Sequence, residues 1–150
     1  GSEMCIRDRT ESRLMSDPLV ALDVLTRLRL KRVSLSIDDF GTGHSSLAQL
    51  RDVPFDELKV DRSFVRGAHA DPELQVLLHG MVDMARQLGL KTVAEGVEDT
   101  EDLMHVRACG CDIAQGYRIG RPMAAGALPA WLSRWNRERP LLWKSRGDQG

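Results

Sequence analysis

Residues 37–47 read Ile-Asp-Asp-Phe-Gly-Thr-Gly-His-Ser-Ser-Leu, and this stretch decides the fold class that we expect. An apolar run at 33–37 leads directly into two carboxylates, Asp38 and Asp39, and then into a glycine-rich loop. Adjacent carboxylates repel each other, so such a pair is placed either in full contact with water or around a bound cation. Asp-Asp before a glycine loop is, taken alone, an ordinary solvated turn. The choice depends on whether other polar groups reach the same place.

Three further strand-like segments also end on polar side chains. Lys59 and Asp61 close a segment at 56–60, Glu95 follows an apolar run, and Gln115 follows Ile113-Ala114. Strands of a parallel sheet are covered on both faces and read almost wholly apolar, so polar residues at their downstream ends require an explanation. In open α/β sheets and in eight-stranded barrels, ligands bind at the carboxyl ends of the strands. The sequence therefore predicts one acidic pocket that also holds a lysine and an amide.

Helical segments alternate with these strands. We expect strands at 4–8, 33–38, 56–60, 91–95 and 112–115, and helices at 17–30, 45–50, 71–89, 99–110 and 126–135. Parallel strands need helical crossovers, which this alternation supplies. The pattern predicts an α/β fold, either a barrel or a doubly wound sheet. Five units are too few to close an eight-stranded barrel.

Composition narrows the class of protein further. The chain has 150 residues, which is one domain or part of one, and its net charge of −1 gives no reason to expect a nucleic-acid polymer as a partner. Cys5, Cys109 and Cys111 are odd in number and lack a Cys-x-x-Cys pattern, which indicates reduced thiols in a cytoplasmic setting. Cys109 and Cys111 are interpreted as packing residues. No apolar run reaches the length of a membrane span, so any membrane anchor of the parent protein is expected in upstream segments.

Five short motifs carry a family resemblance. They are Thr10-Glu11-Ser12, Asp38-Asp39-Phe40-Gly41-Thr42-Gly43, Lys59-Val60-Asp61, Ala94-Glu95-Gly96-Val97-Glu98 and Gln115-Gly116-Tyr117. Each motif alone is a weak signal, but together, in this order, they resemble the second part of an EAL domain, the family of bacterial cyclic di-GMP phosphodiesterases. The resemblance covers residues 10–135. It implies roughly the last five units of a TIM-like (β/α)₈ barrel, two Mg²⁺ or Mn²⁺ ions per complete site, and cleavage of cyclic di-GMP to linear pGpG.

The resemblance also implies a role for each matching residue. Asp38, Asp39 and Glu95 are implied as metal ligands, and Asp8 matches the position of another. Lys59, Glu95 and Gln115 are implied as catalytic residues: Lys59 holds the attacking water and offsets charge on the phosphate, and Gln115 orients water or phosphate. Supporting roles fall to Glu11, Asp61, Glu98, Gly41, Thr42 and Gly43. Glu11 is expected to steady the loop at 39–46, which in the family couples metal occupancy to dimerisation. Glu98 alternatively caps the helix that follows it.

The chain departs from the family pattern at its start. The resemblance implies that the Glu-Ala-Leu signature and an asparagine ligand downstream of it lie on earlier strands, and this sequence contains neither. The family places a glutamate at position 8, whereas Asp8 reaches about 1.5 Å less, and a misplacement of about 1 Å can cost roughly a hundredfold in rate. Residues 1–9 do not resemble the family strand, and we interpret them as a foreign or altered start. Residues 136–150 are interpreted as a polar, basic tail.

Two functions from different classes stay open. The first is two-metal hydrolysis of cyclic di-GMP by the complete domain, with the isolated chain inactive because ligand positions are missing or altered. The alternative is a catalytically degenerate EAL module that binds cyclic di-GMP or a protein partner as a sensor. For the parent protein, the resemblance implies a homodimer and an attached N-terminal sensor or diguanylate cyclase domain.

Overall fold

A single sheet of parallel strands forms the centre of the computed structural model, which describes residues 7–9, 18–42 and 47–143. The five strands are β1 (Arg7–Arg9), β2 (Leu35–Phe40), β3 (Glu57–Val60), β4 (Lys91–Ala94) and β5 (Ile113–Ala114). Each lies beside its neighbour in the sequence, in the order β1-β2-β3-β4-β5. A doubly wound sheet reverses its strand order at one point, whereas this sheet does not. The prediction of a partial barrel is therefore confirmed.

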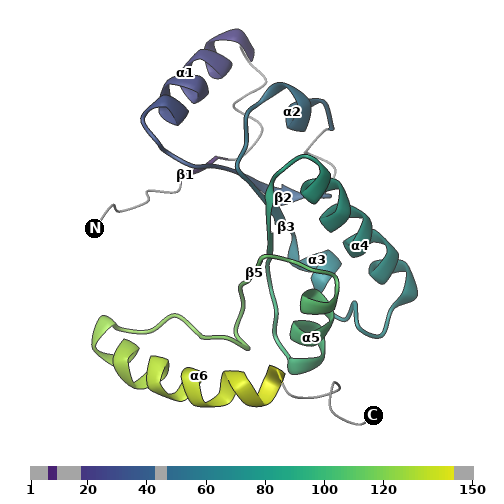
Figure 1. The fold of residues 1–150 in the computed structure, drawn as a ribbon, viewed down its shortest axis with the longest axis vertical. Helices are drawn as coiled ribbons and strands as arrows, with labels where there is room; N and C mark the ends of the chain where they lie inside the picture. Colours follow the sequence, from purple (N-terminus) through teal and green to yellow (C-terminus); the bar gives the residue numbers. More distant parts are fainter. Residues whose placement is uncertain (1–6, 10–17, 43–46, 144–150) are drawn as a thin grey trace.

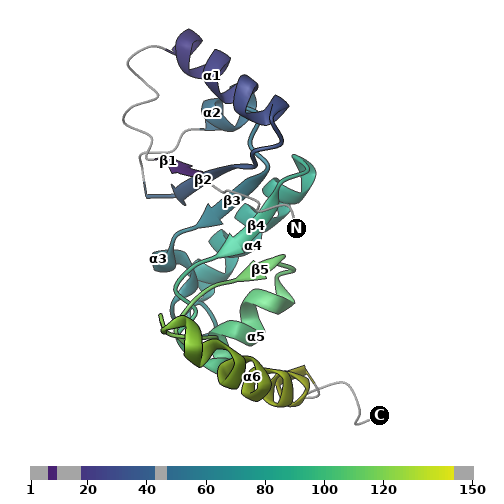
Figure 2. The same ribbon diagram turned by 90° about the vertical axis from the view of Figure 1, so that its left-hand side faces the viewer.

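Helices follow each of the strands, and those before β5 connect one strand to the next. They are α1 (Pro18–Leu30), α2 (Leu47–Asp52), α3 (Arg62–Val65), α4 (Pro72–Gln87), α5 (Thr100–Ala108) and α6 (Leu128–Trp143), with a short 3₁₀ helix, η2 (Ala125–Ala127), before the last. Right-handed crossovers in consecutive order place successive connections on the same face of a sheet. Figure 1 shows α4 and α5 together on one side of the strands. In Figure 2 the strands follow one another from β1 to β5, with α1 and α2 at one end and α6 at the other.

Two helices differ from the sequence prediction. The sequence analysis does not predict α3, a four-residue helix that is too short to show a periodic pattern. The predicted end of α6 at Trp135 is wrong, because the helix continues to Trp143 through Pro140. In the segment beyond the predicted end, Glu138 forms ion pairs with Arg118 at 3.9 Å and with Arg134 at 4.0 Å. Within the described ranges, no helix has both the length and the hydropathy of a membrane span.

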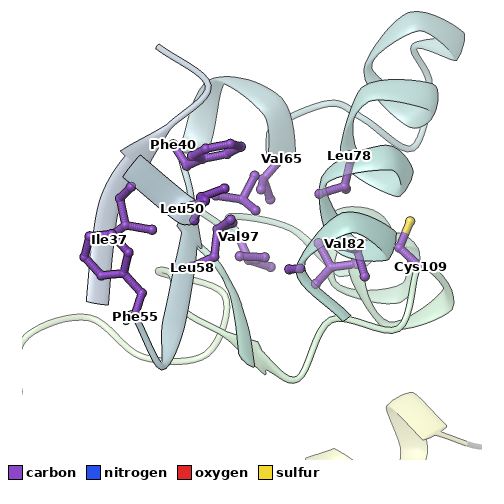
Figure 3. Packing of buried hydrophobic residues seen from close by; sticks show 14 of the residues in the cluster. Ile37, Phe40, Leu50, Phe55, Leu58, Val65, Leu78, Val82, Val97 and Cys109 are labelled. Atoms are coloured by element: carbon purple, nitrogen blue, oxygen red, sulfur yellow. The ribbon is translucent and has the colours of Figure 1, made fainter. Parts of the chain in front are cut away.

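The apolar core lies between the sheet and the helices that cover it. Figure 3 shows Leu58 of β3 with Ile37 of β2 on one side and Leu78 and Val82 of α4 on the other. Leu58 and Leu78 have no exposed surface. Cys109 belongs to this core and Cys111 packs against it, both as free thiols, which confirms their predicted packing role. Burial raises the pKa of the Cys111 thiol to about 11.

At the amino ends of the strands, two aspartate side chains link neighbouring strands by hydrogen bonds. The Oδ2 atom of Asp56, just before β3, accepts the N–H of Leu35 at 2.9 Å. Asp112, just before β5, accepts both the N–H and the hydroxyl of Thr92, at 2.8 and 3.0 Å. Thr92 is only 1% exposed, so these bonds satisfy polar groups that water does not reach.

Candidate active site at the carboxyl ends of the strands

A bulge at the end of β2 brings the two adjacent aspartates to one place. Ile37 pairs with Leu58 and Phe40 pairs with Val60, so β2 contains one residue more than β3 between these pairs. Successive side chains of a regular strand point to opposite faces, and an extra residue breaks that alternation. Asp39 has a φ of 52°, a left-handed conformation that aspartate adopts more readily than most residues. Asp38 and Asp39 can therefore share one cluster.

The cluster contains three carboxylates. Asp38, Asp39 and Glu95 each offer one oxygen, and these oxygens all lie within 4.8 Å of one another. Asp38 and Glu95 are half-buried, and Asp39 is exposed. Glu95 directly follows β4, and its N–H donates to the carbonyl of Val60 at 3.1 Å. The carboxyl ends of β2, β3 and β4 thus meet at the predicted acidic site.

Lys59 reaches this cluster from β3. Its Nζ atom lies 2.9 Å from Oε1 of Glu95 and 3.6 Å from Oδ1 of Asp38, and its side chain is 12% exposed. Its strand neighbours, Leu58 and Val60, are fully buried in the core, so Lys59 occupies the opposite face of the sheet. One ammonium balances only part of the charge of three carboxylates. The negative charge that is left suits a bound cation.

A pocket of about 440 Å³ lies beside the cluster. Its lining comes from the ends of four strands and the turns after them: Asp39, Asp61, Arg62, Glu95, Gly96, Glu98, Gln115, Gly116 and Tyr117. The predicted site residues Asp61, Glu98 and Gln115 therefore share one cavity with two of the three clustered carboxylates. This is the arrangement that the sequence predicts for strand ends at one edge of a parallel sheet.

Close backbone contacts hold Gln115 at the pocket. Its N–H donates to Ala94 at 2.9 Å, and its carbonyl accepts the N–H of Val97 at 3.0 Å. A Cβ atom on Gly116 would lie 2.1 Å from the carbonyl oxygen of Val97, so a residue with a side chain does not fit there. The Gln-Gly pair is thus a point of close approach between the turns after β4 and β5.

Two predicted supporting carboxylates have partners of their own. Asp61 caps α3 and accepts the N–H of Ser63 at 2.9 Å and its hydroxyl at 2.5 Å. Burial alone would raise the pKa of Asp61, but the bonds from Ser63 and the nearby Arg62 lower that pKa below its ordinary value. Glu98 pairs with Arg66 at 3.3 Å, and Asp99, not Glu98, caps α5.

The glycine-rich loop is described only in part. Gly41 has a φ of 102°, and a Cβ atom there would lie 2.5 Å from the ring of Phe64. The hydroxyl of Thr42 donates to the carbonyl of Asp39 at 2.9 Å, which ties the turn to the bulge. Glu11 and Gly43 lie outside the described residues. The backbone of Asp8 pairs with Ser36, two residues before Asp38, and its side chain is not among those described.

Sequence reasoning assigned no role to several residues at the pocket. Arg62 and Tyr117 line it. Arg62 directly follows the motif Lys59-Val60-Asp61 and Tyr117 ends the motif Gln115-Gly116-Tyr117, so their position was a usable signal. The guanidinium of Arg121 lies 4.6 Å from the centre of the Tyr117 ring. Arg66, the partner of Glu98, comes from a different turn and no local pattern points to it.

Comparison with known proteins identifies the family. The EAL domain model matches residues 8–122, and the chain belongs to the EAL-domain family. One relative is the cyclic di-GMP phosphodiesterase NbdA of Pseudomonas aeruginosa, which is 46% identical over 123 residues. The match covers 82% of this chain but only 16% of NbdA, so the chain spans a small part of that protein.

Solved structures of the family share the fold. The EAL domain of Mycobacterium smegmatis DcpA superimposes with a TM-score of 0.78 at 34% identity, over 86% of this chain and 58% of that one. Klebsiella pneumoniae BlrP1, solved as a complex with manganese and cyclic di-GMP, gives a TM-score of 0.68 at 33% identity, over 75% of this chain and 29% of that one. Both superpositions agree with a fold that is part of an EAL barrel.

Proposed function

We propose that this chain supplies the carboxyl-terminal part of the active site of a cyclic di-GMP phosphodiesterase. The observation that carries the proposal is the convergence of Asp38, Asp39, Glu95 and Lys59 at the ends of three strands. A relative of this chain is a phosphodiesterase for this dinucleotide. The reaction adds one water molecule across one of the two phosphodiester bonds of cyclic di-GMP and yields linear pGpG.

The clustered carboxylates fit divalent metal ions. All three donors are oxygens, which favour Mg²⁺ or Mn²⁺ over zinc, and their spacing allows two or more of them to reach one ion. Asp38, Asp39 and Glu95 would hold the ions, and BlrP1 has been solved with manganese. A bound pair of ions would lower the pKa of a water molecule and neutralise charge on the phosphate. We propose two Mg²⁺ or Mn²⁺ ions per complete site.

The remaining residues act on water and phosphate. Lys59 lies against Glu95 and Asp38, so its ammonium is placed to hold a water molecule at the cluster and to offset negative charge that develops on the phosphoryl oxygens. The Gln115 amide lies at the same pocket and can orient that water or the phosphate. Asp61 and Glu98 shape the pocket from the turns that follow β3 and β4.

The isolated chain is proposed to be inactive, and the parent protein active. The backbone of Asp8 pairs with that of Ser36, two residues before Asp38, which supports a ligand position there, and aspartate is shorter than the glutamate that the resemblance implies. Further ligands are expected from upstream strands. NbdA is several times longer than the matched part, which supports further domains in the parent protein. We propose that these include a sensor or a diguanylate cyclase domain, and that the parent protein is a homodimer.

Metal binding can be tested on the 150-residue chain itself. We expect Mn²⁺ to broaden the amide NMR signals of Phe40 and Gly96 before those of other residues. Asp38→Asn should weaken this binding by about tenfold or more, as loss of a ligand would. The control is Asp52→Asn, which removes an exposed carboxylate that pairs with Arg51. Broadening that starts elsewhere, or that Asp38→Asn leaves unchanged, would contradict the assignment.

Hydrolysis is tested with the parent protein. Incubation with Mn²⁺ and cyclic di-GMP should produce pGpG, detected by chromatography, and Lys59→Met should lower kcat by about a hundredfold or more. Asp52→Asn again serves as the control. The 150-residue chain should give no turnover. Tight binding of cyclic di-GMP by the parent without cleavage would favour the sensor alternative instead.

A further inference from the structure

A buried aspartate behind the pocket joins two segments that are distant in the sequence. Asp102 lies in the first turn of α5 and has no exposed surface. Its two carboxylate oxygens accept the N–H of Gly67 at 3.1 and 3.0 Å. Oδ1 also lies 2.8 Å from Nδ1 of His69. A helix residue thus binds both the backbone and a side chain of the α3–α4 connection.

The joined segments are continuations of the turns that line the pocket. Asp61 and Arg62 begin α3 and lead into the connection that contains Gly67 and His69. Glu95 and Glu98 lie in the turn that leads into α5. The Arg66–Glu98 ion pair, at 3.3 Å, is a second link between the same two turns. Gly96 provides a third, since a Cβ atom there would lie 2.4 Å from Cβ of Arg62.

The cluster of His69, Asp99 and Asp102 has the spacing of a metal site but is already occupied by protein contacts. Both oxygens of Asp102 are used by Gly67, and one also by His69. Asp99 accepts the N–H of Asp102 at 2.7 Å as the cap of α5. The cluster is therefore a brace within the protein.

We propose that Asp102 and His69 are positioning residues of the active site. They fix the spacing of the turns after β3 and β4, and the Lys59–Glu95 contact and the adjacent pocket require that spacing. Neither residue lines the pocket, so they act through the segments that they join. This inference rests on the proposed function, because positioning has a consequence only if the pocket binds a substrate.

The charge of His69 makes the brace sensitive to pH. Its imidazole pairs with Asp102, and the negative charges of Asp99 and Glu101 also act on it. The charged residues closest to His69 in the sequence are Asp71, which caps α4, and Arg66, which pairs with Glu98. The hydrogen bond to Asp102 outweighs the opposing effect of desolvation, and with the two other acidic charges it raises the pKa of His69 above 6.5. As pH rises through that pKa, the imidazolium is lost and the brace weakens.

The test is amide hydrogen exchange of the 150-residue chain, followed by NMR with no metal or dinucleotide present. Asp102→Asn should lower the protection factors of Gly67, Glu95 and Val97 by about tenfold, the effect of losing one charged hydrogen bond. In the unchanged protein these protection factors should fall between pH 6 and pH 8, as the imidazolium is lost. His69→Gln keeps a donor for Asp102, so it should lower the protection factors less than Asp102→Asn does, and it should remove their dependence on pH. The matched control is His79→Gln, which removes an exposed histidine that pairs with Asp83.

The amides of β2 report global stability and separate positioning from general destabilisation. If Glu95 and Val97 lose no more protection than β2 does, Asp102 is a local brace only and the proposal is wrong. If Asp102→Asn does not fold, His69→Gln provides the test instead. The proposal is wrong if the protection factors of Glu95 and Val97 still fall between pH 6 and pH 8 in that variant. Because this measurement uses neither Mn²⁺ nor cyclic di-GMP, its failure is distinct from failure of the proposed function.

Discussion

The backbone of Asp39 explains why two adjacent carboxylates can serve one site. The sequence predicted both aspartates as ligands, but neighbouring residues of a strand normally point to opposite faces. The bulge and the φ of 52° resolve that conflict. Neither feature has a local signal, because Asp-Asp-Phe is compatible with a regular strand. The residue types were therefore predictable, and the conformation that unites them was not.

Substitutions at position 39 should separate conformation from charge. Asp39→Val should lower the free energy of unfolding by about 1–2 kcal/mol, because a β-branched residue is strained at this φ. Asp39→Asn should cost less than about 0.5 kcal/mol, since asparagine tolerates the left-handed region. Urea unfolding of the 150-residue chain measures both. Equal losses in the two variants would show that the positive φ carries no cost.

Among the secondary-structure elements, those with strong local signals were predicted well. Helices were expected to begin at 71 and 99, and in the structure the side chains of Asp71 and Asp99 cap α4 and α5 by accepting backbone N–H groups. The strands follow from apolar runs interrupted by turn residues. The short α3 and the end of α6 were not predictable, because α3 has only four residues and α6 continues through Pro140, a residue type that normally interrupts a helix.

The link between β4 and β5 should depend on Asp112. Asp112→Ala leaves the buried N–H and hydroxyl of Thr92 without this acceptor, and we expect a loss of about 1–3 kcal/mol in the free energy of unfolding. Asp52→Ala, at an exposed carboxylate, should change stability by less than about 0.5 kcal/mol. Urea unfolding at pH 7 compares the two. A loss in Asp112→Ala as small as in the control would mean that water replaces the aspartate.

At the scale of the whole molecule, the position of the candidate site was predictable, but the contacts between the turns behind it were not. Parallel strands carry their ends to one edge, so Asp38, Lys59, Glu95 and Gln115 follow from topology alone. The pairing of Asp102 with Gly67 and His69 joins residues that are far apart in the chain, and no sequence pattern in either segment predicts it. Such contacts depend on how whole units pack.

The stability of the chain should fall as pH rises above about 6.5. The folded state raises the pKa of His69, so its contribution is fully present below the ordinary value and is lost as pH rises through the raised one. Thermal unfolding between pH 6 and pH 8 should show a falling midpoint. In His69→Gln the midpoint should fall less over the same pH range, because the contribution of His69 is gone. In His79→Gln the midpoint should fall as it does in the unchanged protein. If the midpoint falls with pH as steeply in His69→Gln as in the unchanged protein, His69 is not the cause of the pH dependence.

The consecutive strand order has a consequence for how the protein is made. Each strand pairs only with the strand just before or after it in the chain, so every pairing becomes possible as soon as one further unit has been synthesised. Contacts of short range in sequence form quickly, and chains that are still being translated fold from their first-made end. The sheet can therefore grow stepwise at the ribosome, and the edge that carries the candidate site is assembled one strand end at a time.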